Sequence, residues 1–181
     1  MTAPPFTDGA ADRFSELFGR FWDSTVPEAE TARQVALIEA CLGLRPPSRL
    51  LVVPSGCGRI ALGLGRRGHQ VLGVETCPDA AGRSAGLAAR AGLSVAFVSE
   101  APPAGRGGWD AAICVGLRRP AAEYGDALAL VLAPGAQALV EADGAARAYT
   151  VQAFERAGFD LVGEHPGIDS ATRPTLALRL R

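Results

Sequence analysis

The residues with the clearest potential for chemistry are a glycine turn, residues 54–59 (PSGCGR), and an acid beyond it, Glu75. Gly56 and Gly58 allow the backbone to approach a ligand closely, and the helix that starts there offers unpaired N–H groups and a partial positive charge. Glu75 ends the next apolar run, 19 residues after Gly56 and 17 after Gly58. A carboxylate at that place can accept both hydroxyls of a ribose, so the pair predicts a nucleoside-containing ligand.

Other interpretations of the same residues stay open. Gly56-x-Gly58-x-x-Ala61 also fits the dinucleotide fingerprint, which tolerates alanine at its third position, so a nicotinamide-dependent enzyme is an alternative. A tight strand-to-helix turn followed by a surface glutamate would give the same pattern without any ligand.

The remaining reactive residue types restrict the chemistry. No lysine occurs, which excludes Schiff-base and P-loop lysine chemistry. The four cysteines lack CxxC spacing and there are only two histidines, so we expect neither a metal site nor a disulfide framework. Cys57 lies in the glycine turn with no histidine expected nearby to activate it. We expect His69 to be structural and His165 to lie in a surface turn.

The composition indicates one ordinary soluble domain. The chain has 181 residues, of which 48% are hydrophobic and 20% charged, and a formal net charge of −1. With this charge balance the protein has no net positive charge that would attract nucleic acid or an anionic membrane. The start of the chain lacks a signal-peptide pattern, and no apolar run is long enough to span a membrane. Together with the cysteine usage, these features predict a cytoplasmic protein.

The elements that must position the turn and Glu75 alternate along the chain. After a disordered tail at 1–9, aromatic residues at helical spacing predict a helix over 10–22, and a second helix is expected over 27–41. Short apolar runs then alternate with helical stretches, which is typical of βαβ units and a mainly parallel sheet. The expected strands are 50–53, 70–74, 93–98, 109–115, 137–141, 159–164 and 175–180, with helices at 60–67, 79–91, 121–132 and 148–157.

This order predicts an α/β fold of the Rossmann-like, doubly wound class, with a seven-stranded sheet, an antiparallel last strand and two N-terminal helices. We expect a single domain over 10–181, made of a helical cap at 10–45 and an α/β core at 48–181. In such sheets a ligand binds beyond the carboxyl ends of the strands, where the turn and Glu75 are expected.

From Phe14 onward the sequence resembles the class I S-adenosylmethionine-dependent methyltransferases, particularly small bacterial members that act on small molecules. Residues 50–80 are similar to the first motif of the family and the acidic strand end that follows it. The stretches APGAQALVEA (133–142), FERAGFDLV (154–162) and FSELFGRFWD (14–23) resemble later family segments and the aromatic helix that often covers the cofactor.

The resemblance implies S-adenosylmethionine as the cofactor and assigns residues to it. Pro54, Ser55, Gly56, Cys57 and Gly58 would lie against its methionine portion. Glu75 would hold the ribose, Thr76 would flank the adenine, and Glu100 with Ala101 would border the adenine amine. The further contacts implied are Val115 near the reactive methyl group and Trp22 as a cover. A general base is optional, and Glu141 and Tyr124 are the candidates.

Two departures from the family pattern keep an alternative function open. Val52 stands where the family usually has an acid, and only one helix separates Glu141 from Phe159, where many members insert an acceptor pocket. The acceptor, a small molecule, would bind among the N-terminal helices and the loops at 117–125 and 142–148, or a homodimer partner or another subunit would complete the site. The alternative is a methyltransferase-like protein without methyl transfer, which binds the cofactor, stabilises a partner or catalyses a different reaction.

Overall fold

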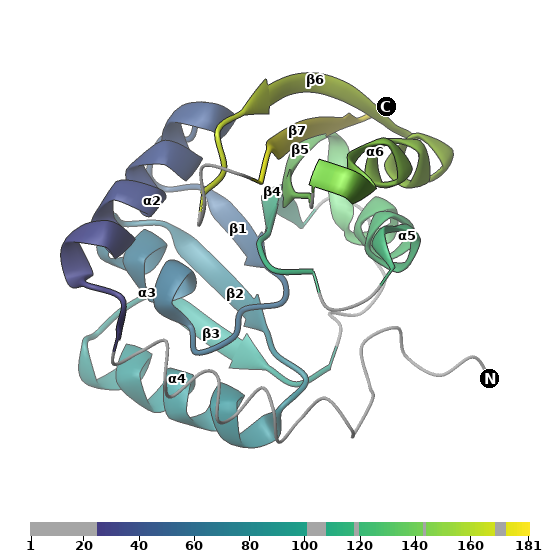
Figure 1. The fold of residues 1–181 in the computed structure, drawn as a ribbon. Helices are drawn as coiled ribbons and strands as arrows, with labels where there is room; N and C mark the ends of the chain where they lie inside the picture. The colour runs from purple at the N-terminus through teal and green to yellow at the C-terminus, as the bar shows by residue number, and fades with distance from the viewer. Residues whose placement is uncertain (1–24, 101–107, 118–119, 143, 169–172) are drawn as a thin grey trace. The chain divides into compact units, whose positions relative to one another are not determined.

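The computed structural model describes residues 25–100, 108–117, 120–142, 144–168 and 173–181 (Figure 1). The expected helix over 10–22 and the expected tail at 1–9 lie outside these residues. Seven strands form one sheet in the order β3-β2-β1-β4-β5-β7-β6. The predicted α/β fold class, with a mainly parallel seven-stranded sheet, is therefore confirmed.

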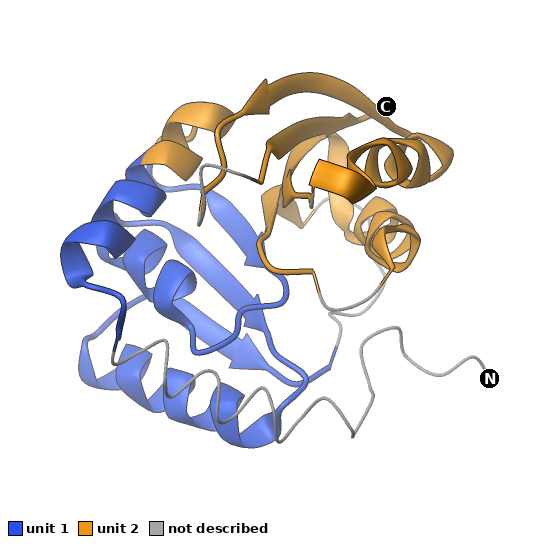
Figure 2. Ribbon diagram, in the orientation of Figure 1, with its two compact units in different colours: residues 1–36, 46–102 blue, residues 37–45, 103–181 orange. Residues whose placement is uncertain are grey.

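The chain forms two compact units, shown in different colours in Figure 2. Unit 1 comprises residues 1–36 and 46–102, and unit 2 comprises residues 37–45 and 103–181. The helix α2 (Glu28–Leu42) contributes its first part to unit 1 and its last part to unit 2.

Unit 1 contains three parallel strands and the helices that connect them. The elements in chain order are β1 (Arg49–Val52), α3 (Arg59–Arg66), β2 (Gln70–Val74), α4 (Pro78–Arg90) and β3 (Val95–Val98). The strand β2 lies between β1 and β3, with Leu51 opposite Leu72 and Val74 opposite Val98. Buried residues in β1, such as Leu50 and Leu51, are apolar on both faces of the strand, as expected where helices cover a parallel sheet.

Unit 2 contains the other four strands. Its elements are β4 (Trp109–Cys114), α5 (Ala121–Val131), β5 (Leu132–Glu141), the 3₁₀ turn η1 (Gly144–Ala146), α6 (Arg147–Arg156), β6 (Phe159–His165) and β7 (Thr175–Leu180). The strand β5 runs parallel to β4, whereas β7 runs antiparallel to both β5 and β6. The rings of Phe154 and Phe159 pack edge to face, with centroids 5.3 Å apart, and hold α6 against β6.

The expected element boundaries agree with the structure within about two residues, with one exception. The strand β5 begins at Leu132, whereas the sequence placed a turn at Ala133–Gly135 and began the strand at Gln137. The pairing with β4 passes from Trp109 opposite Leu132 to Ala111 opposite Gln137, so residues 133–136 bulge out of the ladder. Gly135 lies within this bulge and has a φ of 80°.

No helix in the described part of the chain is long and apolar enough to cross a membrane.

Candidate functional site

The candidate site of unit 1 lies at the carboxyl ends of β1 and β2 and is built around the glycine turn. The backbone N–H of Ser55 donates to the carbonyl of Val74 at 2.8 Å, which attaches the start of the turn to β2. The N–H of Gly58 donates to the carbonyl of Ser55 at 3.0 Å, which closes the turn. Gly58 then caps α3, since its carbonyl accepts the N–H of Leu62 at 2.8 Å. The predicted strand–turn–helix arrangement is therefore present.

Gly56 is the point where the backbone of the turn is most open. Its φ of 56° lies in the left-handed region that disfavours side chains. A Cβ placed on it would meet no heavy atom of the described residues within 4 Å. Within the described part of the chain, nothing therefore blocks a ligand that approaches the backbone at Gly56 from this side.

Ser55 adds a polar group to the turn. Its side chain is buried, and within the described residues its Oγ has no hydrogen-bond partner. Buried hydroxyl groups are usually satisfied, so this one is available for a bond that the protein's described residues do not provide.

Glu75 lies directly after β2 and is only 1% exposed. Its backbone N–H donates to the carbonyl of Val98 at 2.9 Å, and its Oε1 accepts the N–H of Cys77 at 3.3 Å. Cys77 is the N-cap residue of α4, so the carboxylate stands at the positive end of that helix. The backbone and α4 therefore hold the acid at the carboxyl end of β2, the strand to which the turn is attached.

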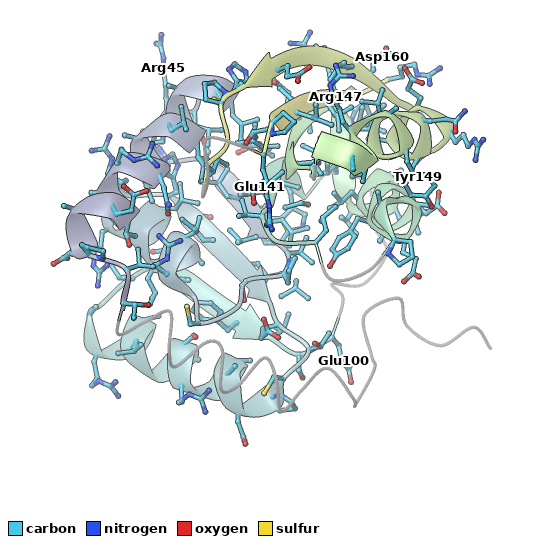
Figure 3. The ribbon with its side chains drawn as sticks, in the orientation of Figure 1. Arg45, Glu100, Glu141, Arg147, Tyr149 and Asp160 are labelled. Carbon is cyan, nitrogen blue, oxygen red and sulfur yellow. The ribbon has the colours of Figure 1, made fainter. Side chains whose placement is uncertain are left out.

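Two further predicted residues of unit 1 follow neighbouring strands at the same distance. Val74 of β2 and Val98 of β3 lie opposite each other in the sheet. Thr76 comes two residues after Val74, and Glu100 comes two residues after Val98. Thr76 is half-buried and Glu100, labelled in Figure 3, is exposed. The predicted contacts Ala101 and Trp22 lie outside the described residues.

The predicted residues of unit 2 are described within that unit. Val115, half-buried, follows the end of β4, and Cys114 pairs with Val140 directly before Glu141. Glu141 is 4% exposed and ends β5 (Figure 3). Tyr124 is 2% exposed and lies in α5. Val115 and Glu141 thus lie at adjacent carboxyl strand ends.

Cys114 and His69 lie in surroundings that fit a structural role better than a reactive one. Complete burial raises the pKa of the Cys114 thiol to about 12, so this cysteine stays protonated and is a poor nucleophile. His69 is fully buried and its Nδ1 accepts the N–H of Ser48 at 3.2 Å, in keeping with the structural role expected for it. The described residues contain no group of three or more potential metal ligands.

Sequence reasoning missed the hydrogen bonds that join the turn and the start of α3 to other helices. Ser84 in α4 donates from its Oγ to the carbonyl of Cys57 at 2.9 Å. Arg59 at the start of α3 donates to Gln34 and, at 3.1 Å, to the Oγ1 of Thr31 in α2. No local pattern marks these long-range partners. Gly73, a glycine inside a strand, was the one available signal of a close approach.

Comparisons with known proteins match these observations at the level of the fold. No protein-family model and no curated protein matches the sequence. Solved structures match over most of the chain. A TehB-like S-adenosylmethionine-dependent methyltransferase from Corynebacterium glutamicum superposes with a TM-score of 0.71 at 14% identity, covering 93% of this chain and 98% of that one.

Two other solved structures extend the comparison. The 1,6-didemethyltoxoflavin-N1-methyltransferase of Burkholderia thailandensis, solved with 1,6-didemethyltoxoflavin and S-adenosylhomocysteine, gives a TM-score of 0.69 at 22% identity, covering 99% of this chain and 91% of that one. The [4+2]-cyclase SpnF gives 0.66 at 18% identity, covering 82% of this chain and 80% of that one. The chain therefore has the fold of class I S-adenosylmethionine-dependent methyltransferases, the fold that the resemblance implied.

Proposed function

We propose that this protein is an S-adenosylmethionine-dependent methyltransferase that acts on a small-molecule acceptor. The observation that carries the proposal is the buried carboxylate of Glu75 at the carboxyl end of β2, the strand to which the N–H of Ser55 attaches the glycine turn. A ribose over the turn would offer two hydroxyl donors to this carboxylate, and hydrogen bonds to charged groups are the stronger ones.

The residues of unit 1 include polar groups of the kind that a nucleoside ligand needs. Residues 54–58 would lie against the methionine portion, where the unpartnered Oγ of Ser55 supplies a polar contact. Thr76, Glu100 and Ala101 would surround the adenine. Val115 would border the methyl group and Trp22 would cover it, while Glu141 or Tyr124 would accept a proton from an acceptor that needs deprotonation.

The chemistry asks little else of the protein. When bound, S-adenosylmethionine supplies a methyl group on a sulfonium, which is already a strong electrophile. The remaining task of the chain is to hold the acceptor in line with that group and to exclude water, and orientation alone contributes much of the rate.

A second candidate function is a different reaction, or binding alone, in the same pocket. Val52 favours it, because the acid that the family usually carries there is replaced by a buried apolar side chain. The [4+2]-cyclase SpnF shares the fold of this chain but is named for a reaction other than methyl transfer.

Calorimetric titration of the purified protein with S-adenosylmethionine, S-adenosylhomocysteine and NAD tests the proposal. We expect binding of the first two in the micromolar range, corresponding to about −8 kcal/mol, and none of NAD. Preferential binding of NAD would replace the proposal with a nicotinamide-dependent enzyme. Binding of S-adenosylhomocysteine without methyl transfer to any member of a broad acceptor panel would favour the second candidate.

A further inference from the structure

The ring of Phe97, on β3, occupies the space that a side chain would need at each of two glycines. A Cβ on Gly73 of β2 would stand 2.5 Å from Cδ1 and 2.6 Å from Cε1 of the ring. A Cβ on Gly58 would stand 2.8 Å from its Cζ. All three separations are far inside van der Waals contact, so the ring occupies the space that a side chain at either glycine would need. The ring of Phe97 on β3 therefore lies close to Gly73 of β2 and to Gly58 of the turn.

Two serines lie close to the same two glycines. A Cβ on Gly58 would also meet Cβ and Oγ of Ser84, each at 2.9 Å, and a Cβ on Gly73 would meet Cβ of Ser55 at 3.0 Å. Ser84 holds the carbonyl of Cys57 by its hydrogen bond of 2.9 Å. We define Phe97, Gly73, Gly58, Ser84 and Ser55 as the support cluster of the turn.

From these contacts we infer that Phe97 is a positioning residue, which sets the height and orientation of the glycine turn above β2 and thereby the affinity for the methionine portion of the cofactor. The inference rests on the proposed function. Phe97 is half-buried, but where its ring is closely packed the loss of the side chain is transmitted to its neighbours, and here the neighbour is the backbone that a ligand would contact. Gly58 has a φ of 83° and caps α3, so a shift at this residue moves both the turn and the start of the helix.

The test compares two ligands that differ only beyond the nucleoside. S-adenosylhomocysteine carries the amino-acid portion that would lie against the turn, whereas 5′-methylthioadenosine lacks it. Calorimetric titration of Phe97→Ala should show S-adenosylhomocysteine binding weakened by about tenfold, equal to about 1.4 kcal/mol, and 5′-methylthioadenosine binding weakened by less than about threefold. A purely structural role of the ring would not produce this difference between the ligands.

Three further variants guard against a folding defect in Phe97→Ala. Gly73→Ala should weaken S-adenosylhomocysteine binding, because its Cβ would displace the ring. In the double variant Gly73→Ala with Phe97→Ala the new methyl group enters the space left by the ring, so the effects should be less than additive. Phe97→Leu, which keeps most of the apolar volume, should bind S-adenosylhomocysteine more tightly than Phe97→Ala.

The matched control is Phe154→Ala in unit 2, where an equally large aromatic side chain is fully buried. This variant should lower the melting temperature while the affinity for S-adenosylhomocysteine stays unchanged. Equal weakening of both ligands by Phe97→Ala, or weakening of neither in a folded variant, overturns the positioning role. A wild-type protein that binds 5′-methylthioadenosine but not S-adenosylhomocysteine overturns it as well, and a wild-type protein that binds neither removes the proposed function on which it rests.

Discussion

Glu75 is the residue on which the proposed function depends most directly. Its Oε1 accepts the N–H of Cys77, and its backbone follows directly after the end of β2. Replacement by glutamine keeps the size of the side chain and removes the charge that would accept two ribose hydroxyls. We predict that Glu75→Gln weakens S-adenosylhomocysteine binding by about tenfold or more, since a hydrogen bond to a charged group contributes about 1.5–3 kcal/mol.

Calorimetry on Glu75→Gln checks this prediction, with Asp79→Asn as the control. Asp79 lies four residues further on, in the first turn of α4, but is exposed. Its neutralisation should leave the affinity within about twofold of the wild type. If the two variants bind equally well, the role of Glu75 is wrong.

Cys114 gives a prediction for alkaline pH. Burial raises its pKa from 9.0 to about 12 in the folded protein, so between these values the unfolded chain has lost a proton that the folded chain keeps. The free energy of unfolding should therefore fall as the pH rises above about 9. Lysine is absent from the sequence, so no lysine titration obscures this range. Cys41, whose pKa burial also raises, acts in the same direction.

Urea unfolding of the wild type and of Cys114→Ala at pH 7 and pH 10 measures this effect. The variant should be less stable at both values because of the cavity, but should lose less stability between them. An identical loss in both proteins would show that the Cys114 thiol is not the group responsible.

At the scale of elements, hydrogen bonds from one side chain add to the packing between α2 and α3. Arg59, the last residue of the glycine turn and the first of α3, donates to Thr31 and Gln34 of α2. Arg33 on the same helix instead forms an exposed ion pair with Glu30, and exposed pairs contribute little. We predict that Arg59→Met lowers the free energy of unfolding by about 1.5 kcal/mol or more, because it leaves buried polar groups without this donor.

Chemical denaturation of Arg59→Met and of the control Arg33→Met distinguishes these contributions. Arg33→Met should unfold at the wild-type denaturant concentration. Equal destabilisation by both substitutions would contradict the contribution assigned to the hydrogen bonds of Arg59.

The same scale explains how far the sequence could predict the structure. Buried parallel strands read as short apolar runs, so β1 and β2 could be placed within one residue, and the glycine turn with Glu75 followed from their ends. Contacts between distant elements leave no such periodic signal, and the positions of Phe97 and Ser84 under the turn became visible only in the structure. The bulge in β5 was missed for a related reason, because a Pro-Gly pair predicts a turn whether or not the flanking strand continues beyond it.

At the scale of the whole molecule, charge decides which partners the protein can attract. The chain carries 18 basic and 19 acidic residues, and its isoelectric point is about 6.1. Proteins that bind nucleic acid without sequence readout depend on a positive surface that displaces counterions, and their affinity falls steeply with salt. No net positive charge is available here for binding of that kind.

We therefore predict that the protein does not shift short duplex DNA or transfer RNA in a gel at low salt, where non-specific binding is strongest. In the same buffers the affinity for S-adenosylhomocysteine should change by less than about twofold between low and high salt, because a largely buried carboxylate is screened much less than exposed charges. A retarded RNA band that disappears as salt rises would instead reveal a local basic surface that the net charge conceals. Such a result would move the expected acceptor from a small molecule to a nucleic acid, while leaving the proposed cofactor site of unit 1 unchanged.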